Sequence, residues 1–454
     1  MPSDRQSARQ STCQSAPKPA PQPRRGVAAL TVVMVLFFIM ALVAAYTNRN
    51  LIFEQRISAN SYRLARAADA AEAGLDWAVA LLNGGRINDL CVPSDLVTDL
   101  DFRRRYLVDS TNESNGAGGY ALVSSNTTFP ACIIDSGTAL NCICPTLANG
   151  NPGMVAPADG VGAAFRLNFR LPGSDVYPGS VSVIARGCAS PGEGGSACYI
   201  QSGAEVSVDA KAGGQVTLGL LRALPFAPVA TLTAGRNILA TGGVLTVVNS
   251  HANTGLTAHA GGLAQANAPG TLLLVGPAGS GSDGLLQNDS YLSDLVNPAG
   301  LADDTWFKRM FALDRVNYAR QPGVISLDCA LVGCNSASLV ATLARYPRHP
   351  IWINGNLSIT AAGNLGSATE PVMLIVTGTF TVAANTQIFG FVHANDITWT
   401  TPASLQGAMV AANDFTSTAN ATLVYRRDVL DIIRLRYGSF VRIPGSWKLL
   451  STGL

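Results

Sequence analysis

The sequence predicts an α+β chain in which a long N-terminal helix precedes an antiparallel β domain and a β-solenoid. Three observations predict this architecture. The stretch from Val27 to Tyr46 is twenty residues long and carries no charge. Eight cysteines follow it, and a short phrase near the C-terminus recurs, with Ala-Asn-Asp at 394–396 and again at 412–414.

Residues 1–26 form a leader that is rich in Pro, Gln and Ser and ends in Arg24-Arg25-Gly26. We expect this leader to be disordered. The twenty residues from Val27 are enough to cross about 30 Å of hydrocarbon as a helix. Arginines directly before such a helix favour a cytoplasmic N-terminus and an exported remainder. The sequence therefore predicts a single-pass membrane protein.

The helical pattern continues beyond the uncharged stretch. Apolar residues keep helical spacing through residues 47–83, and Gly84-Gly85 provides a stop signal. The predicted helix, 27–83, would be about 85 Å long at 1.5 Å per residue. Residues 27–46 would lie in lipid, and the last part of the helix would pack on a folded domain.

The cysteine count agrees with export to an oxidising compartment. Cys13 lies in the leader, and the eight cysteines after it are an even number. Cys188 and Cys198 bracket a loop between two strand-like segments, so we expect a disulfide that staples a hairpin. Cys329 and Cys334 form a second local pair.

The remaining four cysteines are Cys91, Cys132, Cys142 and Cys144. A disulfide within the C-x-C pair would be strained, so we expect Cys142 and Cys144 each to bond one of the other two. The sequence leaves the pairing open. The alternative is a four-thiolate zinc site; the disulfides are preferred, and no metal is expected.

The repeat near the C-terminus predicts a solenoid. Each unit has an apolar–Thr/Ser–apolar strand, a short polar turn and one closing Leu or Ile, such as Leu405 and Leu423. The same template fits 357–365 and 380–388. A period of about 20 residues suits one coil of a β-solenoid, in which alternate residues point into a continuous apolar column. An antiparallel β-sandwich with accidental similarity is the alternative.

These elements give the domain boundaries. Residues 84–215 would form the disulfide-tied β domain, and 216–454 the solenoid domain with an insertion at 263–350. Short amphipathic helices at 303–311 and 428–436 would cap open ends of the solenoid, which otherwise expose apolar residues and an unpaired edge.

Composition and spacing argue against an enzyme. The leader carries five Lys or Arg against Asp4, so the chain's net charge of +2 leaves −2 for the remainder, without a nucleic-acid surface. A formal G-x-G-x-x-G at 279–284 lacks a βαβ unit around it. The four histidines lack zinc-protease spacing. No catalytic residue and no cofactor are expected.

Asp396 and Asp414 occupy equivalent positions in successive repeats. Stacked coils would bring them close together. Side-chain hydrogen bonds that terminate turns are the preferred reading, while a calcium site and a catalytic pair of carboxylates stay open as alternatives. Trp399 occupies a strand position and is expected to be packed, although exposure would suit a surface-binding role.

The N-terminal features resemble a known family. A basic leader ending in Gly26, followed by an uncharged and then an amphipathic helix, is similar to the class III signal of type IV pilins. Residues 53–60 and 67–75 (FEQRISAN and AADAAEAGL) resemble PilX-type minor pilins, and 351–355 and 441–447 resemble long members of that group. Major pilins have Glu at the fifth mature position; here it is Thr31, which argues against a role as the bulk fibre subunit.

The resemblance implies a non-catalytic minor pilin that acts in pilus priming or assembly, or at the pilus tip. It implies cleavage after Gly26 by prepilin peptidase and N-methylation of Val27. The protein would reside in the bacterial inner membrane, with its bulk periplasmic, and then in the pilus at the cell surface. Its partners would be other minor pilins, pilus-tip proteins and the major pilin. A tip adhesin, a type II secretion pseudopilin and a membrane-anchored polysaccharide-active β-helix enzyme are the alternatives.

Overall fold

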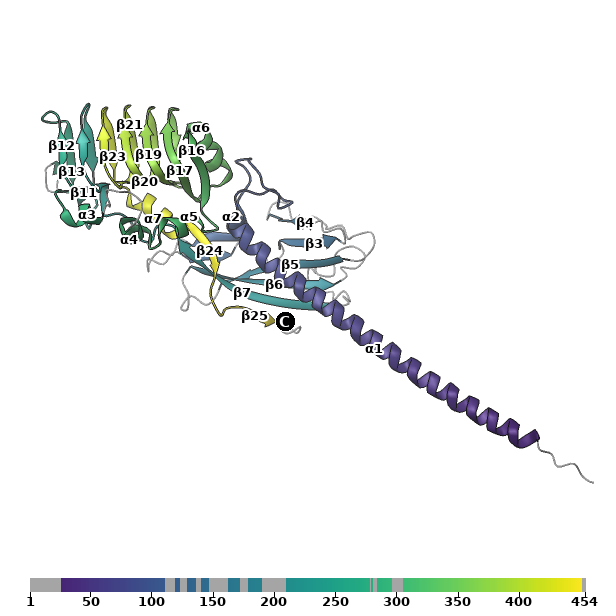
Figure 1. Cartoon of the computed structure of the whole chain (residues 1–454). Coiled ribbons are helices and arrows are strands. Elements are labelled where there is room, and N and C mark those ends of the chain that lie inside the picture. The colour runs from purple at the N-terminus through teal and green to yellow at the C-terminus, as the bar shows by residue number, and fades with distance from the viewer. Residues whose placement is uncertain are drawn as a thin grey trace, which may run out of the picture. The chain divides into compact units, whose positions relative to one another are not determined.

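The structure is a computed structural model of the whole chain, and it contains two compact units, residues 1–61 and 62–454. Helix α1, Gly26–Leu82, begins in the first unit and ends in the second (Figure 1). The described residues are 26–110, 119–122, 129–135, 140–146, 162–171, 179–189, 210–277, 279–280, 284–295 and 305–450.

The first unit contains the apolar part of α1. No glycine or proline interrupts the sequence between Val27 and Ala73, so nothing in it breaks the helical hydrogen bonds. The side chains from Leu30 to Val43 are exposed. The helix is long and apolar enough to cross a membrane. It ends at Leu82, one residue before the predicted end and just ahead of Gly84-Gly85.

A seven-stranded antiparallel sheet forms the first part of the second unit. Its strand order is β24-β7-β6-β5-β3-β4, and β25 also pairs with β7. Helix α2 (Phe102–Tyr106) and the pair β1 (Leu107–Ser110) and β2 (Gly119–Leu122) precede it along the chain. The strands are β3 (Ala131–Asp135), β4 (Leu140–Ile143), β5 (Gly162–Arg170), β6 (Ser180–Ala189), β7 (Ala210–Arg222), β24 (Gly438–Arg442) and β25 (Lys448–Leu450).

The last turns of α1 pack closely on this sheet. Leu75 and Leu82 lie in the same apolar core as Phe165 of β5. A Cβ atom at Gly187 would lie 2.0 Å from the carbonyl oxygen of Ala67, so only glycine permits this approach of strand and helix. The alanines on this face of the helix are therefore packing positions.

The solenoid is inserted between two adjacent strands of the sheet. Strand β7 ends at Arg222 and β24 begins at Gly438, and these two residues are paired antiparallel. This corrects the predicted boundary at 215/216, because β7 runs on to Arg222 and both β24 and β25 belong to the sheet rather than to the solenoid. The cause is apolar burial, since Leu218 of β7 and Phe440 of β24 lie in one core.

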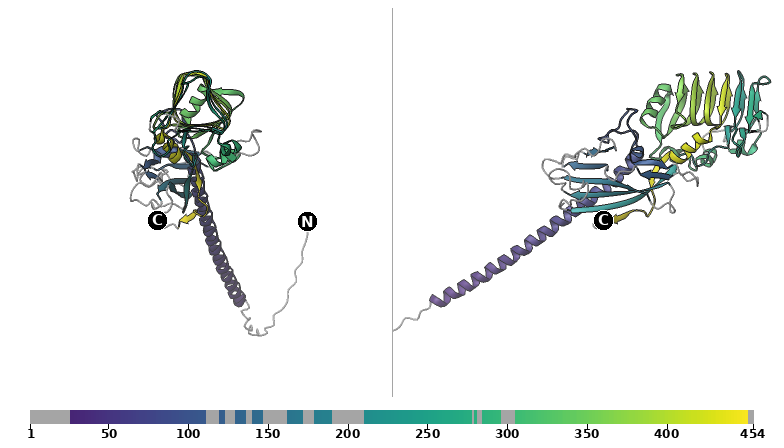
Figure 2. Two further views of the ribbon diagram at one scale, coloured as in Figure 1. Left: turned by 90° about the vertical axis from the view of Figure 1, so that its left-hand side faces the viewer. Right: turned by 180° about the vertical axis from the view of Figure 1, so that it is seen from behind.

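The solenoid is a nearly closed sheet of sixteen strands, in which all pairs but β13 with β14 are parallel. In the left view of Figure 2 its coils overlie one another as a closed loop. The strands are β8 (Ala230–Ala234), β9 (Ile238–Ala240), β10 (Leu245–Val248), β11 (Leu256–Ala260), β12 (Ala264–Ala266), β13 (Leu272–Gly276), β14 (Gly279–Ser280), β15 (Leu285–Leu286), β16 (Ile325–Asn335), β17 (Pro350–Ile359), β18 (Gly363–Leu365), β19 (Val372–Val382), β20 (Thr386–Trp399), β21 (Ala403–Ala411), β22 (Phe415–Ser417) and β23 (Ala421–Val424).

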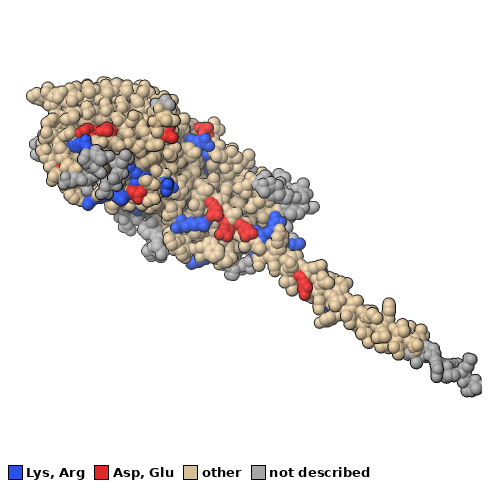
Figure 3. Space-filling model, viewed as in Figure 1, with Lys and Arg blue, Asp and Glu red and all other residues tan. Residues whose placement is uncertain are grey.

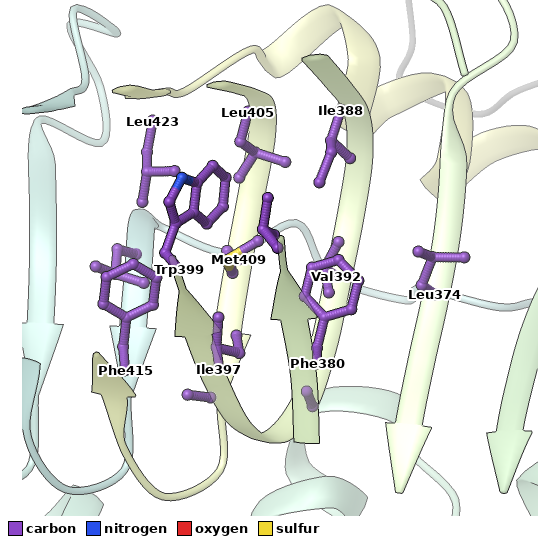
Figure 4. Close-up of a cluster of buried hydrophobic side chains, with 14 of the residues drawn as sticks. Leu374, Phe380, Ile388, Val392, Ile397, Trp399, Leu405, Met409, Phe415 and Leu423 are labelled. Atoms are coloured by element: carbon purple, nitrogen blue, oxygen red, sulfur yellow. The ribbon is translucent and has the colours of Figure 1, made fainter. Parts of the chain in front are cut away.

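Apolar columns fill the inside of the coils, as the repeat predicts. Leu405 pairs with Leu423 on the next coil, and both side chains are fully buried. Phe380, Ile397 and Phe415 form a second column on another face (Figure 4). The parallel, stacked pairing excludes the β-sandwich and confirms the fold class.

The coils do not follow the order of the chain. Strands β8, β9 and β10 stack on β21, β22 and β23, so residues 230–248 form the coil next to the one that ends at 424. Further coils follow in β11, β12 and β13, and β16 starts the stack at the other end. The predicted insertion 263–350 is therefore corrected, because much of it belongs to the solenoid.

Helices cover one outward face of the solenoid instead of capping its ends as predicted. Phe307 and Phe311 of α4 and Tyr318 of α5 pack against Trp352 and Phe391, which point outward from their strands. Leu430 and Ile433 of α7 lie in the same core. The end at β16 is closed by α6, whose Leu339 reaches the inner core. The helices after β15 are α3 (Ser290–Leu295), α4 (Thr305–Phe311), α5 (Arg315–Ala319), α6 (Ser336–Arg345) and α7 (Arg427–Arg436).

Candidate assembly and binding surfaces

The N-terminal helix carries the residues predicted for processing and membrane insertion. Gly26 is the first residue of α1, followed directly by Val27, and the leader before it lies outside the described residues. Thr31 and Tyr46 both lie on the helix and are exposed. The first charged residue after the leader is Arg49. One uninterrupted apolar surface therefore directly follows the predicted cleavage site.

Disulfides tie the sheet to the loops around it. Cys91 bonds Cys144 with a Cα–Cα distance of 5.2 Å, and Cys132 bonds Cys142 at 4.1 Å. Each member of the C-x-C pair thus takes one of the two distant cysteines. In the solenoid, Cys329 bonds Cys334. Cys188 is also disulfide-bonded, while Cys198, its partner in the sequence-based prediction, lies outside the described residues, as does Cys13.

A buried polar cluster joins the end of α1 to the returning strand β24. The side-chain amide of Asn83 donates to the carbonyl of Phe440 at 2.9 Å, and its Oδ1 accepts from the Phe440 N–H at 2.8 Å. Arg103 donates to the carbonyls of Leu82 and Gly438, the latter at 2.8 Å, and lies over the Phe440 ring. Asn83 directly follows α1, and Phe440 lies in β24, the first strand after the solenoid. This cluster therefore attaches the chain leaving the solenoid to the end of the helix.

A second set of contacts links the loop after α1 to the solenoid. Arg86 donates through Nε to the carbonyl of Ala344 at 2.7 Å, and Arg104 bridges Asp101 and Glu370. Burial opposes ionisation of Asp101, but the Arg104 guanidinium and backbone N–H overcome it and lower the pKa of this carboxyl. We name the Asn83 cluster and these contacts together the joint.

His349 lies buried at the joint. Burial and the neighbouring Arg103 lower the pKa of His349 to about 4, so its imidazole is neutral at pH 7. His393 is also buried, and its ring contacts both Phe307 and Phe311. Burial lowers the pKa of His393 well below its ordinary value. His349 lies near Asp101, Arg103 and Arg104, whereas His393 packs among aromatic side chains.

Asp396 and Asp414 accept hydrogen bonds at the turns between strands. Asp414 Oδ1 accepts from the backbone N–H of Asn237 at 2.9 Å and from its side-chain amide at 3.0 Å. The backbone N–H of Asp414 in turn approaches Oδ1 of Asp396 at 3.4 Å. Within the described ranges, no three His, Cys, Asp or Glu side chains gather as a metal site would require. These contacts fit the preferred reading of turn termination.

The other residues singled out in the sequence lie apart. Trp399 is fully buried in the solenoid core, so it offers no exposed aromatic surface. The glycine-rich segment contributes β14, which pairs antiparallel with β13 and is not part of a βαβ unit; residues 281–283 lie outside the described ranges. His259 contacts Asp289 at 2.8 Å.

Sequence reasoning missed two features. The joint could not be read from the sequence, because Asn83 and Phe440 are 357 positions apart. The outward rows of threonine on the solenoid could have been found, because they stand between the two core positions of each repeat. Thr381, Thr398 and Thr416 occupy this middle position on three successive coils.

Comparison with known proteins places the N-terminus in a family. Residues 25–76 match the family model described as PilX N-terminal. No curated protein matches the chain. Among solved structures, the competence-associated pilin ComZ from Thermus thermophilus is 12% identical, with 86% of this chain and 97% of that chain covered and a TM-score of 0.23.

A second structure, the DUF3494 domain of ice-binding protein 1 from Shewanella frigidimarina, is 11% identical, with 45% of this chain and 99% of that chain covered and a TM-score of 0.18. Both overall likenesses are too low to support an argument about this chain. The match over 25–76 covers the uncharged part of the helix and some of the residues that pack on the sheet, including Ala71 and Leu75. The chain therefore has an N-terminal helix that matches the PilX N-terminal family over residues 25–76, joined to a large β-rich unit.

Proposed function

We propose that the protein is a non-catalytic minor pilin that acts in priming or assembly of a type IV pilus, or at its tip. The observation that carries this proposal is the match of residues 25–76 to the PilX N-terminal family. The uncharged stretch from Val27 to Tyr46 supports it, because such a helix can leave the bilayer only where other apolar helices replace lipid. Its partners are then the major pilin and other minor pilins.

Thr31 and the solenoid favour a subunit of few copies. The resemblance places Glu at this position in major pilins, and Thr31 has no carboxylate to offer a neighbouring subunit. We call residues 84–450 the head, and the solenoid adds the strands from β8 to β23 to it. A subunit at the fibre end has one side free of neighbours, and this position suits a large head.

The prepilin leader implies where the protein resides. Arg24 and Arg25 hold residues 1–26 at the cytoplasmic face, and prepilin peptidase cuts after Gly26. The β-rich unit then lies in the periplasm, where its disulfides form. After assembly it lies on the cell surface.

Shearing tests this function. Pili sheared from cells that carry the wild-type chain should contain the protein at a small fraction of the major pilin, and deletion of the gene should reduce the number of pili. Gly26→Val should leave a precursor in the membrane, whereas Ala20→Val in the same leader should behave as wild type. The pseudopilin alternative predicts a different result. The protein would stay in the membrane fraction of piliated cells, and deletion of the gene would impair protein secretion without reducing the number of pili, which would contradict the proposal.

A further inference from the structure

The chain crosses between the sheet and the solenoid twice, at two points that lie side by side. It enters the solenoid after Arg222 of β7 and leaves it before Gly438 of β24, and these two residues are paired. The entry leads back along the chain to α1 through residues 83–222, whereas the exit leads on to β25 and away from α1. A pull between α1 and the solenoid would therefore draw out residues 83–222, unless other contacts carried the force.

The Asn83 cluster connects the two ends of this path directly. Asn83 is the first residue after α1, and its side chain is hydrogen-bonded to both the carbonyl and the N–H of Phe440. Phe440 is in turn paired with Leu220, close to the end of β7. Arg103 adds a bond to the carbonyl of Gly438 at 2.8 Å. The cluster thus closes the path from α1 to the solenoid into a loop.

A second set of bonds reaches the solenoid itself. The N–H of Arg86 donates to the carbonyl of Arg345 at 2.9 Å, and its Nε donates to the carbonyl of Ala344 at 2.7 Å. Both carbonyls belong to the last turn of α6, where a helix leaves its carbonyls without partners of its own. A Cβ atom at Gly85 would lie 2.4 Å from the Arg345 oxygen, so this close approach requires glycine.

These bonds are buried, unlike most charged groups of the molecule. Asn83, Arg86 and Arg103 are each at most 7% exposed. Figure 3 shows charged side chains on the surface along the lower margin of the solenoid and below it, with a largely uncharged upper part. Salt screens exposed charges but affects buried bonds much less, and hydrogen bonds are stronger in a buried site than in water. The joint is therefore a compact set of strong bonds that must break together.

We propose that the joint is a mechanical clasp, through which tension between α1 and the solenoid passes without loading residues 87–217. When the clasp opens, this segment is drawn out, and the disulfide between Cys91 and Cys144 limits how far it extends. In the proposed function, tension arises when α1 is held among other helices and the solenoid is pulled. The clasp itself does not depend on that function, so pulling on the purified chain tests it separately.

Optical tweezers on the full chain in detergent provide the test. Tyr62 and Phe226 are exposed aromatic residues on opposite sides of the joint along the chain, so p-azidophenylalanine at both positions supplies handles with little structural change. At constant force, Asn83→Ala should open about tenfold faster than wild type, which corresponds to a barrier lower by about 1.4 kcal/mol. Asn88→Ala should open like wild type, because the Asn88 side chain bonds only to exposed loop N–H groups.

A second control separates force from stability. Val183 is fully buried in the core of the sheet and makes none of the bonds of the joint. Val183→Ala should lower the stability measured by chemical denaturation, because it leaves a cavity. Its opening rate under force should stay within about threefold of wild type, since the clasp opens before the sheet. Opening that is unchanged in Asn83→Ala, or equally fast in Val183→Ala, would overturn the proposal.

The length of the opening step tests the path of the force. Cys91 and Cys144 are separated by 53 residues, of which the disulfide between Cys132 and Cys142 spans 10. In Cys91→Ser/Cys144→Ser the step should gain about 150 Å of contour length, at about 3.6 Å for each residue released. Dithiothreitol added to the opened wild type should lengthen it by at least as much, and serves if the double variant does not fold. No gain in length would show that the clasp does not protect this segment and would overturn the proposal.

Discussion

The seven-stranded sheet and the solenoid lie in one compact unit, but they acquire their strands in opposite ways. The solenoid takes most of its strands from coils that follow one another closely, and apolar columns such as Leu405 with Leu423 stack them. The sheet takes β24 from beyond the whole solenoid, and it depends on disulfides and on the joint around Asn83 and Arg103. The difference teaches that repetition builds the coils from β16 to β23, while β8 to β10 join that stack, and β24 joins the sheet, through contacts between distant parts of the chain.

The largest expected effect breaks an apolar column. Leu405→Asp places an unpaired carboxylate in a fully buried position and should lower the free energy of unfolding by about 5 kcal/mol or more. Ser404→Asp is the matched control, because this neighbour points outward on the same strand. Hydrogen exchange of the full chain in detergent measures both. If the hydrogen-exchange protection of β20 to β23 were unchanged in Leu405→Asp, the pairing of Leu405 with Leu423 in one buried column would be contradicted.

The contrast between the two regions also limits what the sequence could predict. The short period of the repeat predicted the strand triplets and the buried leucines, because each repeat carries its own core positions. The uncharged helix was equally readable, since length and charge alone determine it. The pairing of Gly438 with Arg222 could not be read, because short apolar segments such as 438–442 fit either region until their partner is known.

An intermediate effect concerns acid and the joint. The pKa of His349 falls from its ordinary 6.5 to about 4 on folding. Between these values the unfolded chain binds more protons than the folded chain, so stability rises with pH and is lost as pH falls from about 6.5 to 4, by roughly 3 kcal/mol in full. The free energy of unfolding, measured across this pH range, should therefore rise with pH.

His349→Gln should flatten that pH dependence, because glutamine does not titrate. His251→Gln is the control, since His251 lies in another part of the solenoid and is not buried. The residual slope in His349→Gln should come from His393, whose pKa is also lowered by burial. An identical pH dependence of the free energy of unfolding in wild type and His349→Gln would show that folding does not lower the pKa of His349.

The smallest expected effect weakens the joint itself. Asn83→Ala removes the pair of hydrogen bonds with the Phe440 backbone and leaves two buried groups without these partners, at a cost of about 2 kcal/mol. Hydrogen exchange should rise in β24 and β25 and stay unchanged in β19 to β21. Asn88→Ala is a control, because the Asn88 side chain bonds only to exposed loop N–H groups. Faster exchange throughout the solenoid would show that the sheet and solenoid unfold as one.

The most direct test of the minor-pilin assignment is the N-terminus of the assembled protein. Mass spectrometry of protein from sheared pili should find a mature chain that begins at Val27, with the amino group methylated, and none of residues 1–26. This result follows from the leader ending in Gly26 and the PilX N-terminal match over 25–76. An intact 1–26 segment on protein in the pilus fraction would contradict the assignment and leave a solenoid held by an uncleaved membrane helix.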